Sequence, residues 1–181
     1  NVYLNFTTQS TDMPATVGSH DQSFNGESDA FIAKLSPDGS ELLFGTYFGG
    51  SGSEGGNSTH NLALDSHGNA YLSTSTNSID LPITQNAFQT KHAGGQNDIA
   101  IAKFSSVKGK LLGCTYLGGS EAEGPDGIYT NQAGDVFFTG TTSSSDFPVT
   151  RGAIEPKLAA QNDAILVMLS ADFSKLSYSS F

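Results

Sequence analysis

Acidic side chains recur at fixed places in this 181-residue chain, and acids are the residue type that could bind a cation or catalyse hydrolysis. Three of them, Asp12, Asp80 and Asp146, stand in one pattern: Ser, any residue, Asp, an apolar residue, Pro, any residue and Thr. A second group follows two glycine pairs and consists of Glu54, Glu121, Glu123 and Asp126. Both groups are candidate binding residues.

The Asp-x-Pro pattern has two interpretations. Its aspartates could be oxygen ligands for Ca²⁺, which takes about six to eight oxygens, but no Asp-x-Asp-x-Asp loop accompanies them. The calcium signal is therefore weak, and we expect no cofactor and no other metal. The pattern also suits a turn, because Pro fixes φ and ends a strand while Asp and Thr accept nearby backbone amides in an Asx-type turn.

Other signatures of catalysis or nucleotide binding are missing. The glycine pairs at 49–50 and 118–119 lack the Lys and Ser/Thr of a phosphate loop, so they indicate turns. No Gly-x-Ser-x-Gly motif occurs, and the histidines have no zinc-binding spacing. We therefore expect a protein that is not an enzyme, with surface histidines at His20, His60, His67 and His92.

The patterns recur at an interval of about 67 residues, which indicates an internal repeat. "GTYFGGS" at 45–51 returns as "CTYLGGS" at 114–120. "SDAFIAKLS" at 28–36 returns as "NDIAIAKFS" at 97–105 and "NDAILVMLS" at 162–170. Several signatures in one fixed order make a repeat the basis of the fold prediction.

Within one repeat the sequence predicts four short strands, at 60–65, 69–76, 98–104 and 110–118, because these stretches are apolar and bounded by Gly, Asn, Asp or Pro. Tight turns are expected at 36–40, 66–68, 106–109 and 132–134. Long loops are expected at 9–28, 49–59, 77–97, 118–125 and 143–162. Four antiparallel strands repeated in this way predict an all-β fold of β-propeller blades, with a β-sandwich pair as the rival.

The repeat divides the chain into about three blades of a larger propeller. Residues 1–48 supply the second to fourth strands of a partial blade, 49–117 a complete blade, and 118–181 a blade with a truncated outer strand. We expect further blades of the same protein, or other chains, to pack against the open ends.

Both faces of a blade should be apolar, because a propeller covers both. Alternation places Phe31, Ala33 and Leu35 on one face and Ile99, Ile101 and Lys103 on the other. Tyr116 and Phe137 are predicted to be packed between blades, and Cys114 to be a buried structural thiol.

Composition limits the partners. The chain is 36% hydrophobic and has 18 acidic against 8 basic residues, for a net charge of −10. This charge opposes binding to nucleic acid and to anionic membranes, and no apolar run is long enough for membrane insertion.

The residues also carry a family resemblance. The order Asp-Ala-Phe-Ile-Ala-Lys-Leu, Pro-Asp-Gly, Thr-Tyr-Phe-Gly-Gly-Ser, Leu-Ala-Leu-Asp and Gly-Asn-Ala-Tyr-Leu resembles the SBBP-type β-propeller repeat of bacterial and archaeal secreted and cell-surface proteins. The resemblance covers almost the whole chain. It implies a propeller, often large and multi-modular, and brings no shared catalytic site.

We therefore expect a non-enzymatic extracellular scaffold or binding module for a carbohydrate, a protein or a neighbouring copy. The alternative is a polysaccharide-active hydrolase or lyase with acids from the long loops. Any ligand should bind on the face of the long loops, since loops on one rim commonly carry function. The sequons at Asn5 and Asn57 are possible glycan acceptors of a secreted protein.

Overall fold

The computed structural model describes residues 1–55 and 60–181, in which the chain forms strands and no helix. The first sheet contains β1 (Val2–Thr8), β2 (Asp29–Leu35) and β3 (Leu42–Phe48). The second contains β4 (Glu54–Gly55), β5 (Leu62–Leu64), β6 (Ala70–Thr76), β7 (Asp98–Phe104) and β8 (Leu111–Leu117). The third contains β9 (Glu123–Thr130), β10 (Val136–Thr142), β11 (Asp163–Leu169) and β12 (Leu176–Ser180).

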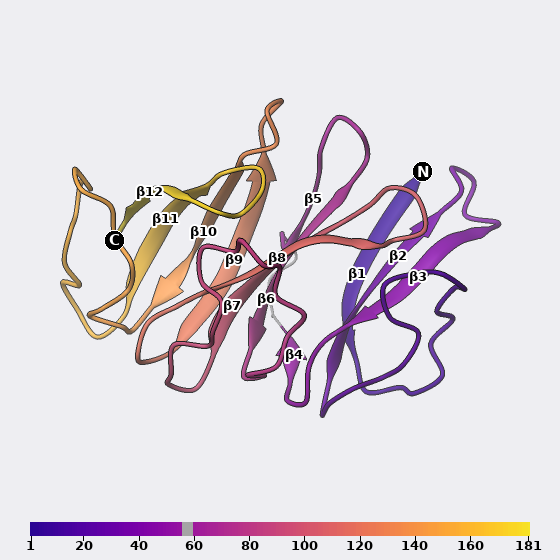
Figure 1. Cartoon of the computed structure of the whole chain (residues 1–181), viewed down its shortest axis with the longest axis horizontal. Coiled ribbons are helices and arrows are strands. Elements are labelled where there is room, and N and C mark those ends of the chain that lie inside the picture. The colour runs from indigo at the N-terminus through magenta and orange to yellow at the C-terminus, as the bar shows by residue number, and fades with distance from the viewer. Residues whose placement is uncertain (56–59) are drawn as a thin grey trace.

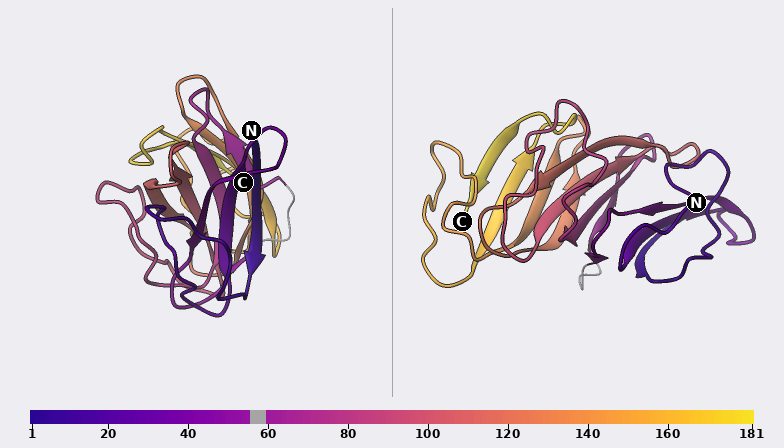
Figure 2. Two further views of the ribbon diagram at one scale, coloured as in Figure 1. Left: turned by 90° about the vertical axis from the view of Figure 1, so that its right-hand side faces the viewer. Right: turned by 60° about the horizontal axis from the view of Figure 1, so that its bottom comes forward.

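The all-β prediction is confirmed, and all pairings within the three sheets are antiparallel. The sheets follow one another along the long axis of the molecule, from the N-terminal sheet at the right to the C-terminal sheet at the left (Figure 1). Seen from the N-terminal side they lie one behind another (Figure 2, left). None of the sheets closes on itself.

Two strand boundaries differ from the sequence prediction. Residues 49–59 were expected to form a loop, yet Glu54 and Gly55 pair with the end of β6 as the short strand β4. The stretch 118–125 was also expected to form a loop, but β9 begins within it at Glu123. Strand β4 and the beginning of β9 are acidic and Gly-rich, so their composition does not predict a strand. They are extended because their backbones pair with β6 and β10.

Each sheet has a forward face, which points to the next sheet along the chain, and a rear face, which points to the previous one. Apolar side chains from the forward face of the first sheet and the rear face of the second form one core; among them are Ile32, Phe48, Leu72 and Tyr116. A second core joins the second and third sheets and includes Tyr71, Ile101, Leu117, Phe138 and Val167. The sheets are thus stacked face to face through two apolar junctions.

The predicted alternation is confirmed. Phe31 and Ala33 lie on the rear face of the first sheet, whereas Ile99 and Ile101 lie on the forward face of the second. Tyr116 is buried as expected, and so is the thiol of Cys114. The prediction for Phe137 is wrong, because this ring is only partly buried, on the forward face of the third sheet, where no further sheet covers it.

The register brings the long loops together at one edge of the stack. Thr76, where one loop leaves β6, pairs with Asp98, where that loop returns. Parallel bridges then join the loop ends of successive sheets, Ser28 to Ser53 and Asn97 to Ala122. The hairpins β5–β6 and β9–β10 project from the opposite, upper edge in Figure 1. No helix that could cross a membrane occurs among the described residues.

Candidate functional site

The long-loop edge holds two buried glutamates, Glu54 and Glu123, at equivalent positions in the second and third sheets. Each accepts one hydrogen bond from the last threonine of the adjacent strand and one from the second amide of the preceding glycine pair. The donors are Thr76 (2.6 Å) and Gly50 (2.8 Å) for Glu54, and Thr142 (2.6 Å) and Gly119 (3.0 Å) for Glu123. We call each such set a glutamate lock, because it ties a glycine turn to the edge of its sheet.

Two of the three motif aspartates, Asp80 and Asp146, hold the same glycine turns from outside, whereas Asp12 accepts a hydrogen bond from the Ser10 hydroxyl. Asp80 Oδ1 accepts a hydrogen bond from the Ser51 amide (2.8 Å), and Asp146 Oδ1 accepts one from the Ser120 amide (2.9 Å). Both aspartates are exposed. The sequence predicted that each aspartate accepts an amide within its own turn. These bonds instead join two loops that are distant in sequence.

The threonine of the motif has a constant role. Its hydroxyl donates a hydrogen bond to a carbonyl of the outermost long strand in each sheet, which fixes the long loop over that strand. The pairs are Thr16 with Gly45 (3.4 Å), Thr84 with Cys114 (3.1 Å) and Thr150 with Ser179 (3.2 Å). The motif is thus built into the fold of every repeat.

Across each junction an aspartate faces the glutamate of the lock. Asp29 Oδ1 and Glu54 Oε2 each lie 2.4 Å from the point where a Cβ on Gly49 would stand, so the two carboxyl groups meet over this glycine. Asp98 and Glu123 meet in the same way over Gly118. These carboxyl pairs join the start of β2 to the second sheet and the start of β7 to the third.

The Oδ1 atoms of Asp29 and Asp98 are buried and have no hydrogen-bond donor. A buried carboxylate oxygen without a donor is costly, but a protonated oxygen can donate to a facing carboxylate. Burial without a donor therefore disfavours the charged form of Asp29 and of Asp98.

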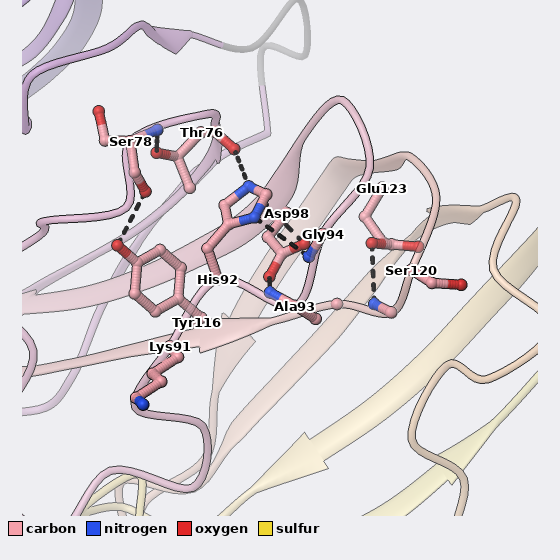
Figure 3. Close-up of polar contacts among 12 residues, drawn as sticks. Thr76, Ser78, Lys91, His92, Ala93, Gly94, Asp98, Tyr116, Ser120 and Glu123 are labelled. Carbon is pink, nitrogen blue, oxygen red and sulfur yellow. Dashed lines mark hydrogen bonds and ion pairs between the residues drawn. The ribbon is translucent and has the colours of Figure 1, made fainter.

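His92 adds a third titratable group to the second junction (Figure 3). Its Nε2 atom lies 3.8 Å from Asp98 Oδ1 and 3.2 Å from the carbonyl oxygen of Thr76, and its ring packs edge-on against Tyr116. The side chain of His92 is only 8% exposed, so the expectation of a surface histidine is wrong here. His20 is also partly buried, against Phe48 and Phe104.

Burial is the main cause that raises the pKa values of Asp29, Glu54 and Asp98. The charge of Asp21 adds to the rise in the pKa of Asp29, and the charge of Asp29 adds to the rise in the pKa of Glu54. Burial raises the pKa of Asp98 to about 6, with the charge of Glu123 adding to the rise and His92 opposing it. Protonation of Asp98 is therefore expected at mildly acidic pH.

This shift predicts an unusual pH dependence of stability. The pKa of Asp98 is about 6 in the folded protein and about 3.9 in the unfolded chain, so the folded protein binds the proton more tightly. The contribution of Asp98 to the free energy of unfolding is therefore fully present below about pH 3.9 and is lost as the pH rises to about 6. Asp98→Asn removes the charge, keeps an acceptor for the Ala93 amide and adds a donor toward Glu123. We expect the stability of this variant relative to wild type to increase by about 2 kcal/mol between pH 4 and pH 7.

Urea denaturation at several pH values measures this difference. Asp163→Asn is the matched control, because Asp163 occupies the same position in the third sheet and its Oδ2 atom likewise accepts a loop amide, that of Ala159. Stability curves of wild type and Asp98→Asn that run parallel from pH 4 to pH 7 would show that the pKa of Asp98 is not raised in the folded protein.

The other predicted acids stand apart from the carboxyl pairs. Glu121 and Asp126 are exposed, Glu121 just before β9 and Asp126 within it. Asn5 is half-buried in β1, and Asn57 lies outside the described residues. The structure thus places Glu54 and Glu123 in the interior, and Asp80, Glu121, Asp126 and Asp146 at the surface.

A polar cavity of about 310 Å³ opens at the long-loop edge between the first and second sheets. Its lining residues are His20, Asp21, Asn25, Gly49, Gly50, Ser51, Asp80 and Pro82. Among residues 1–55 and 60–181, no group of His, Cys, Asp and Glu side chains could hold a metal ion. Asp21, Asn25 and Asp80 give the cavity carboxylate and amide groups.

Sequence reasoning missed Asp29 and Asp98 as site residues. The signal was present, because an aspartate stands immediately before the apolar strand in all three copies of the repeat, at positions 29, 98 and 163. No protein-family model matches the chain, and no curated protein matches it either. The functional argument therefore depends on the geometry.

Proposed function

We propose that this chain is a non-enzymatic scaffold of the β-propeller type, whose three sheets are blades and whose long-loop edge is the binding surface. What supports the proposal is that the same glutamate lock and carboxyl pair occur where the second and the third sheet each meet the sheet before them. A device repeated at every junction serves the stack as a whole, as expected for a repeat protein in which each unit contacts its neighbours.

The resemblance to SBBP-type repeats extends the proposal to a secreted or cell-surface protein that binds a glycan or a surface protein. The cavity between the first and second sheets is the place we propose for a glycan. Asp21, Asn25 and Asp80 give it carboxylate and amide groups that can hydrogen-bond sugar hydroxyls. The negative charge of the chain favours a neutral or cationic glycan over an anionic one.

The alternative function, hydrolysis of a polysaccharide, has one observation in its favour: Asp21 and Asp80 line the same cavity. A glycosidase needs one carboxyl group with a raised pKa to act as the acid. Burial works to raise the pKa of Asp21, but hydrogen bonds from Ser23 and Asn25 outweigh it and lower the pKa. The acids whose pKa values are raised lie in the buried pairs, where a sugar cannot reach them.

Incubation with a panel of neutral, cationic and acidic polysaccharides tests the two functions together. We expect binding by affinity electrophoresis without release of reducing ends, and weaker binding by Asp21→Asn, which changes the cavity. Asp146→Asn is the control, since this residue holds the equivalent turn at the second junction, away from the cavity. Release of reducing ends that Asp21→Asn abolishes would overturn the scaffold proposal in favour of the hydrolase.

A further inference from the structure

The cavity between the first and second sheets lies where the two junctions of the chain differ. Asp21, one of its lining residues, has Gln89 as its equivalent in the next repeat. In both cases the backbone carbonyl accepts a hydrogen bond from the amide of a buried tyrosine, Tyr47 for Asp21 (3.1 Å) and Tyr116 for Gln89 (3.1 Å). The two side chains therefore start from the same place at the two junctions.

Gln89 spans this place at the second junction. Its Nε2 atom donates to Asp98 Oδ2 (3.1 Å), and its Oε1 atom accepts from the Gly118 amide (3.1 Å). The shorter Asp21 turns to its own loop, where its Oδ2 atom accepts from Asn25 Nδ2 (2.6 Å). The first junction therefore lacks the side chain that spans the second, and the cavity of about 310 Å³ opens there.

A second pair of equivalent side chains also differs in chemistry. His92 packs edge-on against Tyr116 (Figure 3), and Phe24 packs edge-on against Tyr47. Each ring precedes the residue whose amide donates to the aspartate of the junction, Ala93 to Asp98 and Asn25 to Asp29. A phenyl ring thus stands at the first junction where the second has an imidazole.

Asp29 is consequently short of donors compared with Asp98. A carboxamide donates to Asp98, and an imidazole lies 3.8 Å from it. Asp29 has a carboxylate and a phenyl ring at the same two positions, and neither group can donate a hydrogen bond. The side chain of Asp29 is fully buried, and its Oδ1 atom, which has no donor, lies against Gly49 in the wall of the cavity.

The charge of the cavity has one sign. Asp21 and Asp80 are its acids, and within residues 1–55 and 60–181 no lysine or arginine lines it. Burial lowers the pKa of His20, although the charge of Asp21 opposes this shift. The imidazole of His20 is therefore neutral at neutral pH and does not balance the two carboxylates.

We propose that this cavity binds the ammonium group of an amino sugar, with the carboxylates of Asp21 and Asp80 as its acceptors. The inference rests on the proposed function, because it names the kind of sugar in the glycan. An ammonium group has three donors and a positive charge, so it brings to the first junction the donors and the opposite charge that this junction lacks. The hydroxyls of the sugar can hydrogen-bond the amide of Asn25.

Isothermal titration calorimetry at neutral pH with two tetrasaccharides tests the ammonium group by itself. One is a β-1,4-linked tetramer of glucosamine, and the other is the same tetramer with every amine acetylated. We expect the glucosamine tetramer to bind about tenfold more tightly or better, since hydrogen bonds between charged groups are among the stronger ones. An acetyl-capped tetralysine peptide carries the same number of amines without the sugar and should bind more weakly.

Two variants and a matched control locate the binding. Asp21→Gln gives the first junction the side chain of the second, so it should close the cavity and weaken binding of the glucosamine tetramer about tenfold or more. Asp80→Asn removes a charge but keeps the Oδ1 acceptor for the Ser51 amide, and it should also weaken binding. Asp146→Asn makes the same change at the equivalent turn of the second junction and should bind like wild type.

The ammonium site would be overturned by equal binding of the two tetramers, by binding of neither, or by tighter binding of tetralysine, which would indicate a protein partner. Unchanged binding by a folded Asp21→Gln would also overturn it. Equal losses in Asp80→Asn and Asp146→Asn would do the same, because they would show attraction by net charge alone.

The proposed function fails by a different measurement. Equal binding of both tetramers without turnover contradicts only the ammonium site. Release of shorter sugars from a tightly bound glucosamine tetramer contradicts only the non-enzymatic scaffold.

Discussion

Tyr116→Ala is expected to lower the free energy of unfolding by about 4 kcal/mol or more. The ring is 1% exposed within the first junction, and loss of a buried aromatic side chain costs about 3–5 kcal/mol. The hydroxyl also donates to the Ser78 carbonyl (2.8 Å) and accepts from the Leu81 amide (3.1 Å), so its removal leaves two groups of the long loop without a partner.

Urea denaturation measures this loss. Tyr116→Phe keeps the ring and should cost about 1–2 kcal/mol, which separates the hydrogen bonds from the packing. Phe137→Ala is the matched control on the uncovered forward face and should cost about 1 kcal/mol or less. Equal losses at Tyr116 and Phe137 would argue against the assignment of covered and uncovered faces.

Gly118→Ala is expected to destabilise the protein by about 3 kcal/mol. A Cβ at this position would lie 2.5 Å from Asp98 Oδ1 and 2.7 Å from Glu123 Oε2, so the carboxyl pair would have to separate. Overpacking of a well-filled site costs about 1–3 kcal/mol, and the displaced Glu123 would also weaken its bonds to Thr142 and Gly119.

Thermal unfolding of Gly118→Ala and Gly124→Ala checks this prediction. Gly124 is the control, because its nearest contact for a Cβ is Thr141 Oγ1 at 3.4 Å, an ordinary separation. The effect should also shrink in an Asp98→Ala background, which makes room beside Gly118. A full-sized effect in that background would show that the carboxyl pair is not the cause.

The repeat made most of the strands predictable. Alternation of apolar residues in β2 and β7 placed Phe31 and Ile99 on opposite faces, and both assignments are confirmed. Phe137 shows the limit of such reasoning, since a strand pattern reveals which residues share a face but not whether another sheet covers it. Whether the sheets are blades of a propeller remains our proposal.

The roles of the acids were harder to predict. Glu54 and Glu123 stand among glycines and polar residues, which is the composition of a solvated loop, yet their burial depends on donors that are far away in sequence. Asp98 becomes noteworthy only beside Glu123, which belongs to the next repeat. A pattern within one repeat cannot show a contact that two repeats create together.

The second sheet is covered on both faces, and this has a consequence for the motions of the chain. Opening of the first or third sheet exposes one apolar junction, whereas opening of the second exposes both. In a stack whose units contact only their neighbours, the cost of local opening therefore rises toward the middle. Fluctuations should begin at the two ends, with β6 and β7 the last strands to lose their backbone hydrogen bonds.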